Sequence, residues 1–460
     1  MKYLSTRGTT PPASFLDVLM SGLASDGGLF VPDHWASLPK FSGKESYIEI
    51  AAQVIGPYTD GDISRSELLA LLEDTYNDKV FMGGHPAPLC PLDEHTFLME
   101  LFHGPTLAFK DVALQLLGRL FDLTLQKSGQ HLTIIGATSG DTGSAAIEAC
   151  KGRENITVYI LHPHGRTSEV QRRQMTTVLS ENIHNIAIEG SFDDCQALVK
   201  QAFSDSDLRA KKTLSAINSI NWARIIAQTV YYVWAASQFE KPVAFAVPTG
   251  NFGNVYAAYV AKRMGANIGP LVVGSNQNDI LTRFFVSGTM QRESVIPSLS
   301  PSMDIQVSSN FERYLWDLLG RDSPRLAALM DQFKSSGTFT LEPDLMSTAR
   351  QDFIAYRCDD DETLRIIDRM YTDYGQVVDP HTAVGIKAML KARAEEKVDS
   401  STPFVALACA HPAKFPAAIK RACGITPHLP PQLADLMTRP ERLSVLPNDF
   451  SKMKSFILKS

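Results

Sequence analysis

The sequence lacks three features that would each assign it to a class of protein. It has no apolar run long enough to cross a bilayer, and no signal-peptide-like apolar segment follows Met1. It has no excess of basic residues, because 44 Lys and Arg accompany 50 Asp and Glu. Its six cysteines form no CxxC pair and no dense framework. These absences argue against a membrane protein, a general nucleic-acid binder and a disulfide-rich secreted domain, and they predict a cytoplasmic protein.

Short apolar stretches alternate with segments of helical spacing along most of the chain. With 460 residues, of which 44% are hydrophobic and 20% charged, it is long enough for two or three domains with sizeable cores. Apolar runs without polar alternation are typical of strands buried on both faces of a parallel sheet. The sequence therefore predicts an α/β protein with strands at residues 131–135, 156–161, 243–247, 271–273 and 404–408.

Turn-rich stretches within the first 95 residues separate amphipathic helices and predict an N-terminal domain at 1–95. Two α/β lobes are expected to follow, at 96–240 and 241–460, with interleaving of the lobes left open. The apolar segment 225–239 is too short to span a membrane and predicts a core helix. The acidic run 359–362 predicts a solvated loop or a helix start.

The segment His103–Asp111 places one lysine among apolar residues at a predicted helix start. A Gly-Pro turn precedes Lys110, and apolar residues with helical spacing follow it. The helix N-terminus and the neighbours Leu107 and Phe109 both disfavour a cation on Lys110. They favour a neutral amine, the form that attacks aldehydes and makes Schiff bases. A surface lysine whose stem packs on Leu107 is the alternative that these residues leave open.

The loop Gly136–Ser144 follows the predicted strand at 131–135 and precedes a predicted helix of small residues. Its three glycines let a ligand approach the backbone closely. Hydroxyls and amides at a helix N-terminus are suited to bind a carboxylate or a phosphate. No Gly-Lys-Ser/Thr follows, so this is not a Walker loop. A tight turn that only caps the helix is the alternative.

The segment Pro248–Asn254 has the same arrangement, between the predicted strand at 243–247 and another small-residue helix. Gly250 and Gly253 let backbone amides converge, and two asparagines can add side-chain donors. Two anion sites and an aldehyde-reactive lysine together suit a cofactor that has an aldehyde and a phosphate, beside an anionic amino-acid substrate. Pyridoxal phosphate has both groups.

Seven ordered segments of the chain resemble those of the threonine synthases. They are Met1–Gly8, Asp26–Pro32, His103–Asp111, Thr138–Gly143, Pro248–Asn254, Ser300–Ile305 with Ser309–Arg313, and Ala410–Phe415. The resemblance is to the longer bacterial and fungal kind and spans nearly the whole chain. It implies a fold-type-II pyridoxal-phosphate enzyme, similar to the tryptophan synthase β subunit, with two open α/β lobes and a helical N-terminal domain.

The resemblance also implies which residues contact the cofactor. Lys110 would hold it as a Schiff base. The related short synthases have Asn where this chain has Asp141, so a hydrogen bond from Asp141 to the cofactor's phenolic oxygen needs a proton on one of the two. Thr or Ser usually faces the pyridine nitrogen where this chain has Cys409, which is either a weaker partner or a core residue. The implied cofactor-binding residues are Lys110, Asp141, Gly250, Asn251, Phe252, Gly253, Asn254 and Cys409, the phosphate lying on 250–254.

The substrate implied by the resemblance is O-phospho-L-homoserine. Its carboxylate would bind the loop after the first strand, and its phosphate would bind the segment 218–224, where the forked guanidinium of Arg224 matches phosphate oxygens. A helix-surface arginine paired with a carboxylate is the alternative for Arg224. The implied substrate-binding residues are Thr138, Ser139, Gly140, Thr142, Asn218, Ser219 and Arg224.

The implied reaction is a γ-elimination followed by β-addition of water, which yields L-threonine and phosphate and is the last step of threonine biosynthesis. Lys110 is the implied catalytic residue, and no metal, nucleic acid or membrane partner is expected. The protein is expected to be a monomer or a homodimer. Two other functions stay open. A β-replacement or dehydratase enzyme that acts on serine-type substrates would not need Arg224 with Asn218 and Ser219, and a non-enzymatic binding module would have little reason to keep both the lysine and a second anion site.

Overall fold

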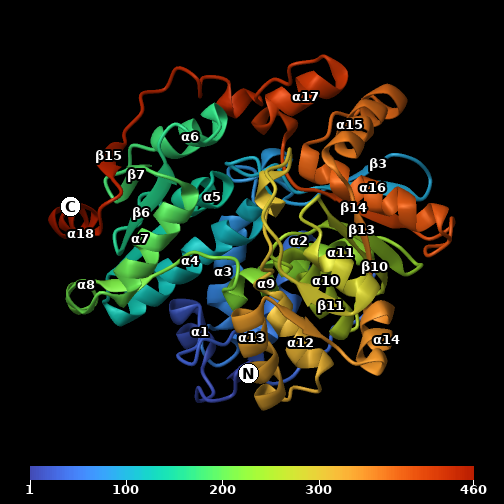
Figure 1. Ribbon diagram of the computed structural model, residues 1–460, viewed down its shortest axis with the longest axis horizontal. Coiled ribbons are helices and arrows are strands. Elements are labelled where there is room, and N and C mark those ends of the chain that lie inside the picture. Colours follow the sequence, from blue (N-terminus) through green and yellow to red (C-terminus); the bar gives the residue numbers. More distant parts are fainter. The chain divides into compact units, whose positions relative to one another are not determined.

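Two sheets, each within its own structural unit, organise the computed structural model, which describes residues 1–460 (Figure 1). Unit 1 consists of Met1–Val18, Leu23–Phe109 and Ser219–Pro427, and unit 2 consists of Leu19–Gly22, Lys110–Asn218 and His428–Ser460. The α/β class predicted from the apolar runs is confirmed. The division into three consecutive domains stays a prediction, and most of the N-terminal segment belongs to unit 1.

The sheet of unit 2 has five strands in the order β15-β7-β6-β5-β8, and every neighbouring pair is parallel. The strands are β5 (Leu132–Ala137), β6 (Ile156–Pro163), β7 (Ile183–Glu189), β8 (Thr213–Ser215) and β15 (Ser444–Pro447). The helices are α4 (Lys110–Ser128), α5 (Asp141–Cys150), α6 (Glu169–Thr176), α7 (Phe192–Ser204), α8 (Ser206–Lys211), α18 (Phe450–Lys459) and the 3₁₀ turn η4 (Pro431–Leu433). The predicted strands at 131–135 and 156–161 are confirmed as β5 and β6.

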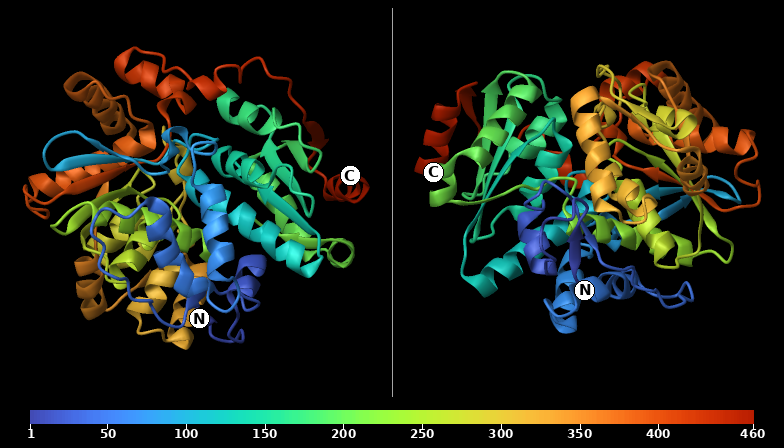
Figure 2. Two further views of the ribbon diagram at one scale, coloured as in Figure 1. Left: turned by 180° about the vertical axis from the view of Figure 1, so that it is seen from behind. Right: turned by 60° about the horizontal axis from the view of Figure 1, so that its bottom comes forward.

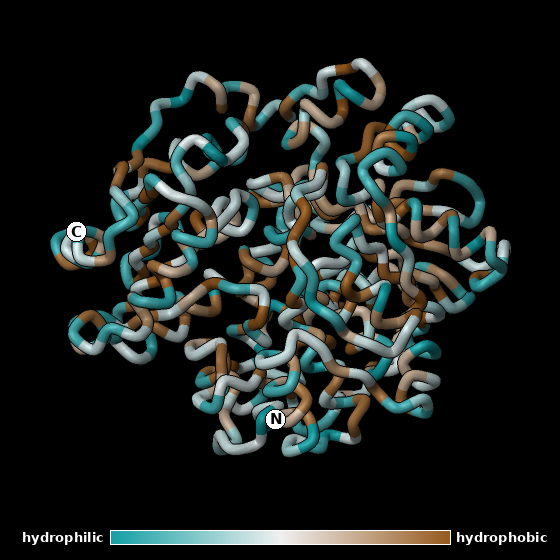
Figure 3. The backbone as a smooth tube through the Cα atoms, in the orientation of Figure 1, coloured by the Kyte–Doolittle hydropathy of each residue, from teal (hydrophilic) through white to brown (hydrophobic).

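The end of the chain completes unit 2. Strand β15 pairs with β7, and α18 follows β15 at the end of the chain (Figures 1 and 2). The buried residues Met453 and Ile457 of α18 pack with Tyr159 of β6 and Leu198 of α7. Helix α18 contains both hydrophilic and hydrophobic residues (Figure 3), and its buried residues Met453 and Ile457 are four positions apart, as expected of a helix with one buried face. One face of this sheet is therefore covered by helices from two distant parts of the sequence.

The main sheet of unit 1 has six strands in the order β13-β10-β9-β14-β4-β3, and only the β3–β4 pair is antiparallel. The strands are β3 (Leu89–Pro91), β4 (Thr96–Glu100), β9 (Val243–Pro248), β10 (Ile268–Ser275), β13 (Phe353–Arg357) and β14 (Phe404–Ala408). Two further sheets have two antiparallel strands each: β1 (Tyr3–Ser5) with β2 (Phe30–Pro32), and β11 (Thr289–Gln291) with β12 (Thr338–Thr340). Because β9 and β14 are parallel neighbours, the loops that follow them leave the same edge of the sheet.

Helices cover the unit 1 sheet (Figure 1). Those that contact its strands are α10 (Gly253–Arg263), α11 (Ile280–Ser287), α14 (Pro343–Asp352) and α16 (Pro380–Ala394). The other helices of the unit are α1 (Phe15–Ser21, whose last residues belong to unit 2), α2 (Tyr47–Thr59), α3 (Arg65–Thr75), α9 (Trp222–Ser237), α12 (Phe311–Leu318), α13 (Ser323–Ser336), α15 (Asp360–Tyr374), α17 (Pro416–Cys423) and the 3₁₀ turns η1 (Met82–Gly84), η2 (Pro301–Met303) and η3 (Pro412–Lys414). The core helix predicted at 225–239 is confirmed as α9, and no helix has the length and hydropathy of a membrane span. The acidic run is a helix start, because Asp359 and Glu362 form a capping box on α15.

The surroundings of the His85 ring predict that acid lowers the stability of unit 1. Its ring lies 4.2 Å from that of Trp234, its Nδ1 accepts from the Ala87 amide at 3.0 Å, and its Nε2 is buried without a partner. Burial, followed by the nearby His103, lowers the pKa of His85 from 6.5 to about 4. The unfolded chain therefore takes up a proton near pH 6.5, whereas the folded chain resists protonation until about pH 4.

We therefore expect the free energy of unfolding to fall as the pH drops from about 6.5 to about 4, by about 1–3 kcal/mol from this ring. Urea unfolding at several pH values should show a smaller loss for His85→Phe, which keeps the aromatic packing but cannot titrate. Substitution of the exposed His34 by Asn controls for general acid effects. Identical pH profiles for the parent protein and His85→Phe would remove His85 as the cause.

Candidate active site

Lys110 is the first residue of α4, as the sequence predicts. The chain before it is fixed within unit 1, because the Phe109 amide donates to the Cys409 carbonyl at 2.8 Å and Ala108 forms an isolated bridge with Ala410. Leu107 is fully buried and has a left-handed backbone, with φ of 60°. A non-glycine residue in this region is uncommon and marks a position that its surroundings determine. The backbone that leads into Lys110 is thus tightly constrained.

A carboxylate accompanies the Lys110 amine in unit 2. Nζ donates to Oδ2 of Asp141 at 3.0 Å, and the two residues are only 7% and 5% exposed. The sequence argument for a neutral amine considered the helix start and the apolar neighbours, but it did not include this carboxylate. An opposite charge at hydrogen-bond distance favours the ammonium form and counters both effects. The surface-lysine alternative is wrong, because Lys110 is buried.

The loop before α5 is held together by its own threonine. Oγ1 of Thr138 accepts from the amides of Gly140 and Gly143, both at 2.9 Å. A Cβ atom at position 143 would lie 2.4 Å from Cγ2 of Thr138, and Gly140 has φ of 146°. Packing and backbone conformation therefore require these glycines. Thr138 is 3% exposed, whereas Ser139 is exposed and Thr142 is partly exposed. Assignment of this loop to the substrate carboxylate stays a prediction.

In unit 1, the segment 250–254 connects β9 to α10, again as predicted. Phe252 has φ of 62°, and its buried ring packs among the rings of Phe311, Tyr314 and Phe353. This side chain is thus a core anchor, which leaves the backbone of the loop for a ligand. The loop stands at the N-terminus of an eleven-residue helix, where backbone amides and the helix dipole favour an anion.

Asn254 provides the observation that tests whether this loop fits a phosphate. Its Oδ1 accepts from the hydroxyls of Tyr231 and Tyr232, the second at 2.8 Å. Its Nδ2 is buried and has no hydrogen-bond partner. Two buried tyrosines thus fix the amide so that its donor end is available, and a buried donor without a partner costs about 1–3 kcal/mol. A phosphate oxygen would satisfy it, so the residues present fit the phosphate of pyridoxal phosphate.

Asn310 links this loop to the segment that contains Ser219. Its Nδ2 donates to the carbonyls of Ser219, at 3.0 Å, and Asn251, at 3.1 Å. Arg313, which is fully buried, donates to Oδ1 of Asn310 and to the Phe30 carbonyl. Neither residue was predicted as part of the site, although both lie in a motif that carried the resemblance. Their buried polar side chains hold the two predicted anion-binding segments of unit 1 in one framework.

Arg224 is buried in α9 and only 4% exposed, so the surface-arginine alternative is wrong. Burial lowers the pKa of Arg224 to about 10, which leaves the guanidinium charged at neutral pH. Tyr231 lies seven residues later, on the same face of the helix. One face of α9 thus presents both a cation and the hydroxyl that orients Asn254. Asn218, the first residue of the predicted phosphate segment, belongs to unit 2.

Cys409 follows β14 directly and is 5% exposed. Its amide donates to Oγ1 of Thr382 at 2.9 Å, and its thiol lies 3.7 Å from the Leu407 carbonyl. The Thr382 hydroxyl in turn donates to the carboxylate of Asp379, which also accepts from the ring of His381 at 2.8 Å. The hydroxyl next to Cys409 is therefore engaged with a buried carboxylate. The assignment of Cys409 to the pyridine nitrogen stays a prediction.

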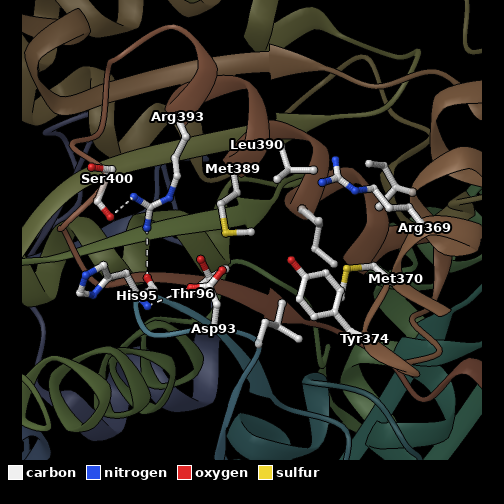
Figure 4. A pocket seen from close by; sticks show the side chains of 13 residues that line it. Asp93, His95, Thr96, Arg369, Met370, Tyr374, Met389, Leu390, Arg393 and Ser400 are labelled. Carbon is white, nitrogen blue, oxygen red and sulfur yellow. Dashed lines mark hydrogen bonds between the residues drawn. The ribbon is translucent and has the colours of Figure 1, made fainter. Parts of the chain in front are cut away.

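A cavity of about 340 Å³ lies at the other end of the unit 1 sheet (Figure 4). Its apolar wall includes Met370 and Met389, and its rim includes Thr96, at the start of β4. The guanidinium of Arg393 is occupied there by the carbonyls of His95 and Thr402, among others. Open α/β sheets bind ligands at the carboxyl ends of their strands, whereas this cavity adjoins amino ends. It contains none of the predicted site residues.

Three family models match the chain. Residues 2–76 match the model described as threonine synthase N terminus, residues 80–332 match pyridoxal-phosphate dependent enzyme, and residues 382–457 match threonine synthase, C-terminal. The second match covers more than half of the chain. It contains both the Lys110 segment and the loop 250–254, whereas Cys409 lies in the third.

Individual relatives match the chain over nearly its whole length. The threonine synthase of Pseudomonas aeruginosa is 50% identical over 99% of this chain and 98% of its own, and that of Schizosaccharomyces pombe is 44% identical over 92% and 89%. Among solved structures, the pyridoxal-phosphate-bound threonine synthase from Brucella melitensis has a TM-score of 0.95 and 46% identity, covering 99% of this chain and 98% of that one. The yeast threonine synthase structure has a TM-score of 0.95 and 36% identity, covering 100% and 98%.

Proposed function

Since the chain belongs to the threonine synthase family of pyridoxal-phosphate-dependent enzymes, we propose that it converts O-phospho-L-homoserine and water into L-threonine and phosphate. The resemblance and the fold-type-II class predicted from the sequence motifs are confirmed by these matches. The observation that carries the proposal is the buried Lys110 amine, held 3.0 Å from a carboxylate at the start of α4. A binding module would have no use for such a reactive group.

Pyridoxal phosphate, when bound, supplies an aldehyde that condenses with amines and a ring that takes up electrons from the substrate's carbon atoms. Lys110 is proposed to hold the cofactor and, once the substrate amine has displaced it, to carry protons between Cα and Cβ of the substrate. Asp141 would stabilise Lys110 while its nitrogen carries the extra proton. The amides of 250–254 and Nδ2 of Asn254 would bind the cofactor's phosphate.

The substrate's two anionic groups are proposed to bind in different places. The loop with the exposed Ser139 and the partly exposed Thr142 would receive the carboxylate. Arg224 would bind the phosphate that leaves, with Asn218 and Ser219 as neutral partners. A substrate without a phosphate would offer no anion for this cation to bind, so Arg224 favours O-phosphohomoserine over serine.

We also propose that the enzyme works in the cytoplasm, as a monomer or homodimer, without a nucleic-acid partner. Six free cysteines support a reducing compartment. The formal net charge of −6 disfavours non-specific binding to nucleic acid. Native mass and fractionation measurements would test these assignments directly.

The function is tested by supplying purified protein and pyridoxal phosphate with O-phospho-L-homoserine and measuring phosphate and L-threonine together. Equal amounts of the two products are expected. L-serine serves as the control substrate, because a dehydratase would release ammonia from it. Absence of both products, or ammonia from L-serine with no phosphate from O-phosphohomoserine, would contradict the proposed reaction.

Cys409→Thr should retain activity, because a hydroxyl at this position can replace the thiol as a partner of the pyridine nitrogen. We expect kcat to stay within about tenfold of the parent value, since one neutral hydrogen bond contributes about 0.5–1.5 kcal/mol. The measurement is steady-state kinetics on protein whose cofactor content has been determined. Cys409→Ala is the matched variant. It removes the sulfur atom and leaves a methyl group that cannot form a hydrogen bond with the pyridine nitrogen. Complete loss of activity in Cys409→Thr with fold and cofactor intact would contradict this role.

A further inference from the structure

The two side-chain oxygens of Asp141 accept hydrogen bonds from groups of different kinds. Oδ2 accepts from the Lys110 ammonium at 3.0 Å, and Oδ1 accepts from Nε2 of Gln171 at 2.8 Å. Lys110 begins α4, whereas Gln171 lies in α6, and all three residues belong to unit 2. One partner is a titratable amine and the other is a neutral amide whose charge does not change.

The orientation of the Gln171 amide is fixed. Its Oε1 accepts from the Ser168 hydroxyl at 2.9 Å, and its backbone amide donates to the same hydroxyl, which caps α6. The side chain is 6% exposed and lies so close to Gly140 that a Cβ there would be 2.6 Å from its Cδ. Ser168 takes the acceptor end of the amide, so the donor end must face Asp141.

The charge next to Asp141 changes when Lys110 reacts. When an ammonium condenses with an aldehyde, one water and one proton are released. The nitrogen beside the carboxylate then carries a positive charge only if it is protonated again. An ionised carboxylate that is 5% exposed needs donors to remain charged. Gln171 is a donor whose hydrogen bond to Asp141 does not depend on the charge of Lys110, and hydrogen bonding to the charged form favours that form.

We propose, on the basis of the function proposed above, that Gln171 is a positioning residue that keeps Asp141 ionised and aimed at the Lys110 nitrogen throughout the reaction. Asp141 then acts as an acceptor for that nitrogen rather than as a donor to the cofactor's phenolic oxygen. An asparagine could not serve as a fixed anion here. In this chain Asp141 thus accepts a hydrogen bond from the Gln171 amide, and the Ser168 hydroxyl fixes the orientation of that amide.

The test compares Gln171→Leu and Gln171→Glu with Thr176→Val. Leu removes the donor, and Glu replaces it by an acceptor of the same shape. Thr176 is a buried α6 residue that bonds Glu441 and the Arg172 carbonyl, so its variant perturbs the same helix away from Asp141. Cofactor affinity, kcat, KM and the visible spectrum of the substrate-free holoenzyme are measured for each, together with urea unfolding.

Both Gln171 variants should retain the cofactor and lose kcat by roughly ten- to hundredfold, with a smaller change in KM, whereas Thr176→Val should lose stability but keep kcat. In Gln171→Leu, the absorbance should move from the longer-wavelength band of the protonated lysine-bound cofactor toward the shorter-wavelength band of the unprotonated form. No such shift is expected in Gln171→Glu or in Thr176→Val. An unchanged spectrum and a kcat within about twofold of the parent for Gln171→Leu would overturn the proposal. If the parent does not act on O-phosphohomoserine, the proposed function fails, but the spectrum still decides the role of Gln171.

Discussion

Replacement of Lys110 by alanine is expected to abolish the formation of threonine and phosphate from O-phosphohomoserine. The lysine is the one group to which the proposed reaction assigns both cofactor attachment and proton transfer. A positioned acid or base alone contributes roughly 10²- to 10⁴-fold to a rate, so kcat should fall by at least about 10³-fold when attachment is lost as well. Product formation under saturating cofactor and substrate measures this directly.

Lys110→Arg provides the matched control. It keeps a cation beside Asp141 and so preserves the buried pair, but a guanidinium does not condense with aldehydes under these conditions. Activity should be lost in both variants, while Lys110→Ala should also be less stable because Asp141 loses its cation. Lys127→Ala, on the exposed last turn of the same helix, should behave like the parent. Reduction of the holoenzyme with borohydride, followed by peptide mapping, should find the pyridoxyl group on Lys110; any other lysine would refute the assignment.

The sequence predicted those site segments whose structure depends on neighbouring residues in the chain. A Gly-Pro turn before apolar residues of helical spacing placed Lys110 at the first position of α4. Glycine-rich turns between an apolar run and a small-residue helix located the segments 136–144 and 248–254. In each case the signal lies within about ten residues, where backbone preference and hydrophobic period are informative.

The partners of these groups could not be predicted in the same way. Gln171 reaches Asp141 from a helix thirty residues away, and Tyr231 and Tyr232 reach Asn254 from the middle of an apolar helix. An adjacent pair of tyrosines in a core helix was the available signal, because a buried hydroxyl needs a partner. The expectation of a neutral Lys110 failed to include Asp141 for the same reason: the loop that contains it is distant in sequence.

The order of the strands in each sheet could not be predicted from the local pattern of apolar residues either. Strand β4 was not predicted, because its apolar run is only Phe97–Met99 and lies between the polar residues Thr96 and Glu100, although it pairs in parallel with β14. Strand β15 and helix α18 lie at the end of the chain, yet they complete the sheet and the core of unit 2. Apolar patterning indicates which residues are buried, but pairing between distant strands depends on the packing of the whole unit.

Arg224→Ala is expected to impair use of O-phosphohomoserine while leaving pyridoxal phosphate bound. A buried phosphate needs a cation, and each charge-assisted hydrogen bond contributes about 1.5–3 kcal/mol. Loss of one or two such bonds should lower kcat/KM by roughly tenfold to several hundredfold or more. Arg224→Lys keeps the charge but lacks the planar fork, so its kcat/KM should lie between those of Arg224→Ala and the parent.

Asn254→Leu is the reciprocal variant, and together the two separate the anion sites. Asn254 presents its unpartnered Nδ2 at the N-terminus of α10, so its replacement should weaken cofactor binding, whereas Arg224→Ala should not. The comparison tests two neighbouring groups, because Arg224 lies on the same face of α9 as Tyr231, and Tyr231 orients Asn254. Cofactor affinity from the visible band and kcat/KM at saturating cofactor are measured on both variants. If Arg224→Ala loses the cofactor band, its guanidinium binds the cofactor's phosphate instead, and the substrate's phosphate must be bound by other residues.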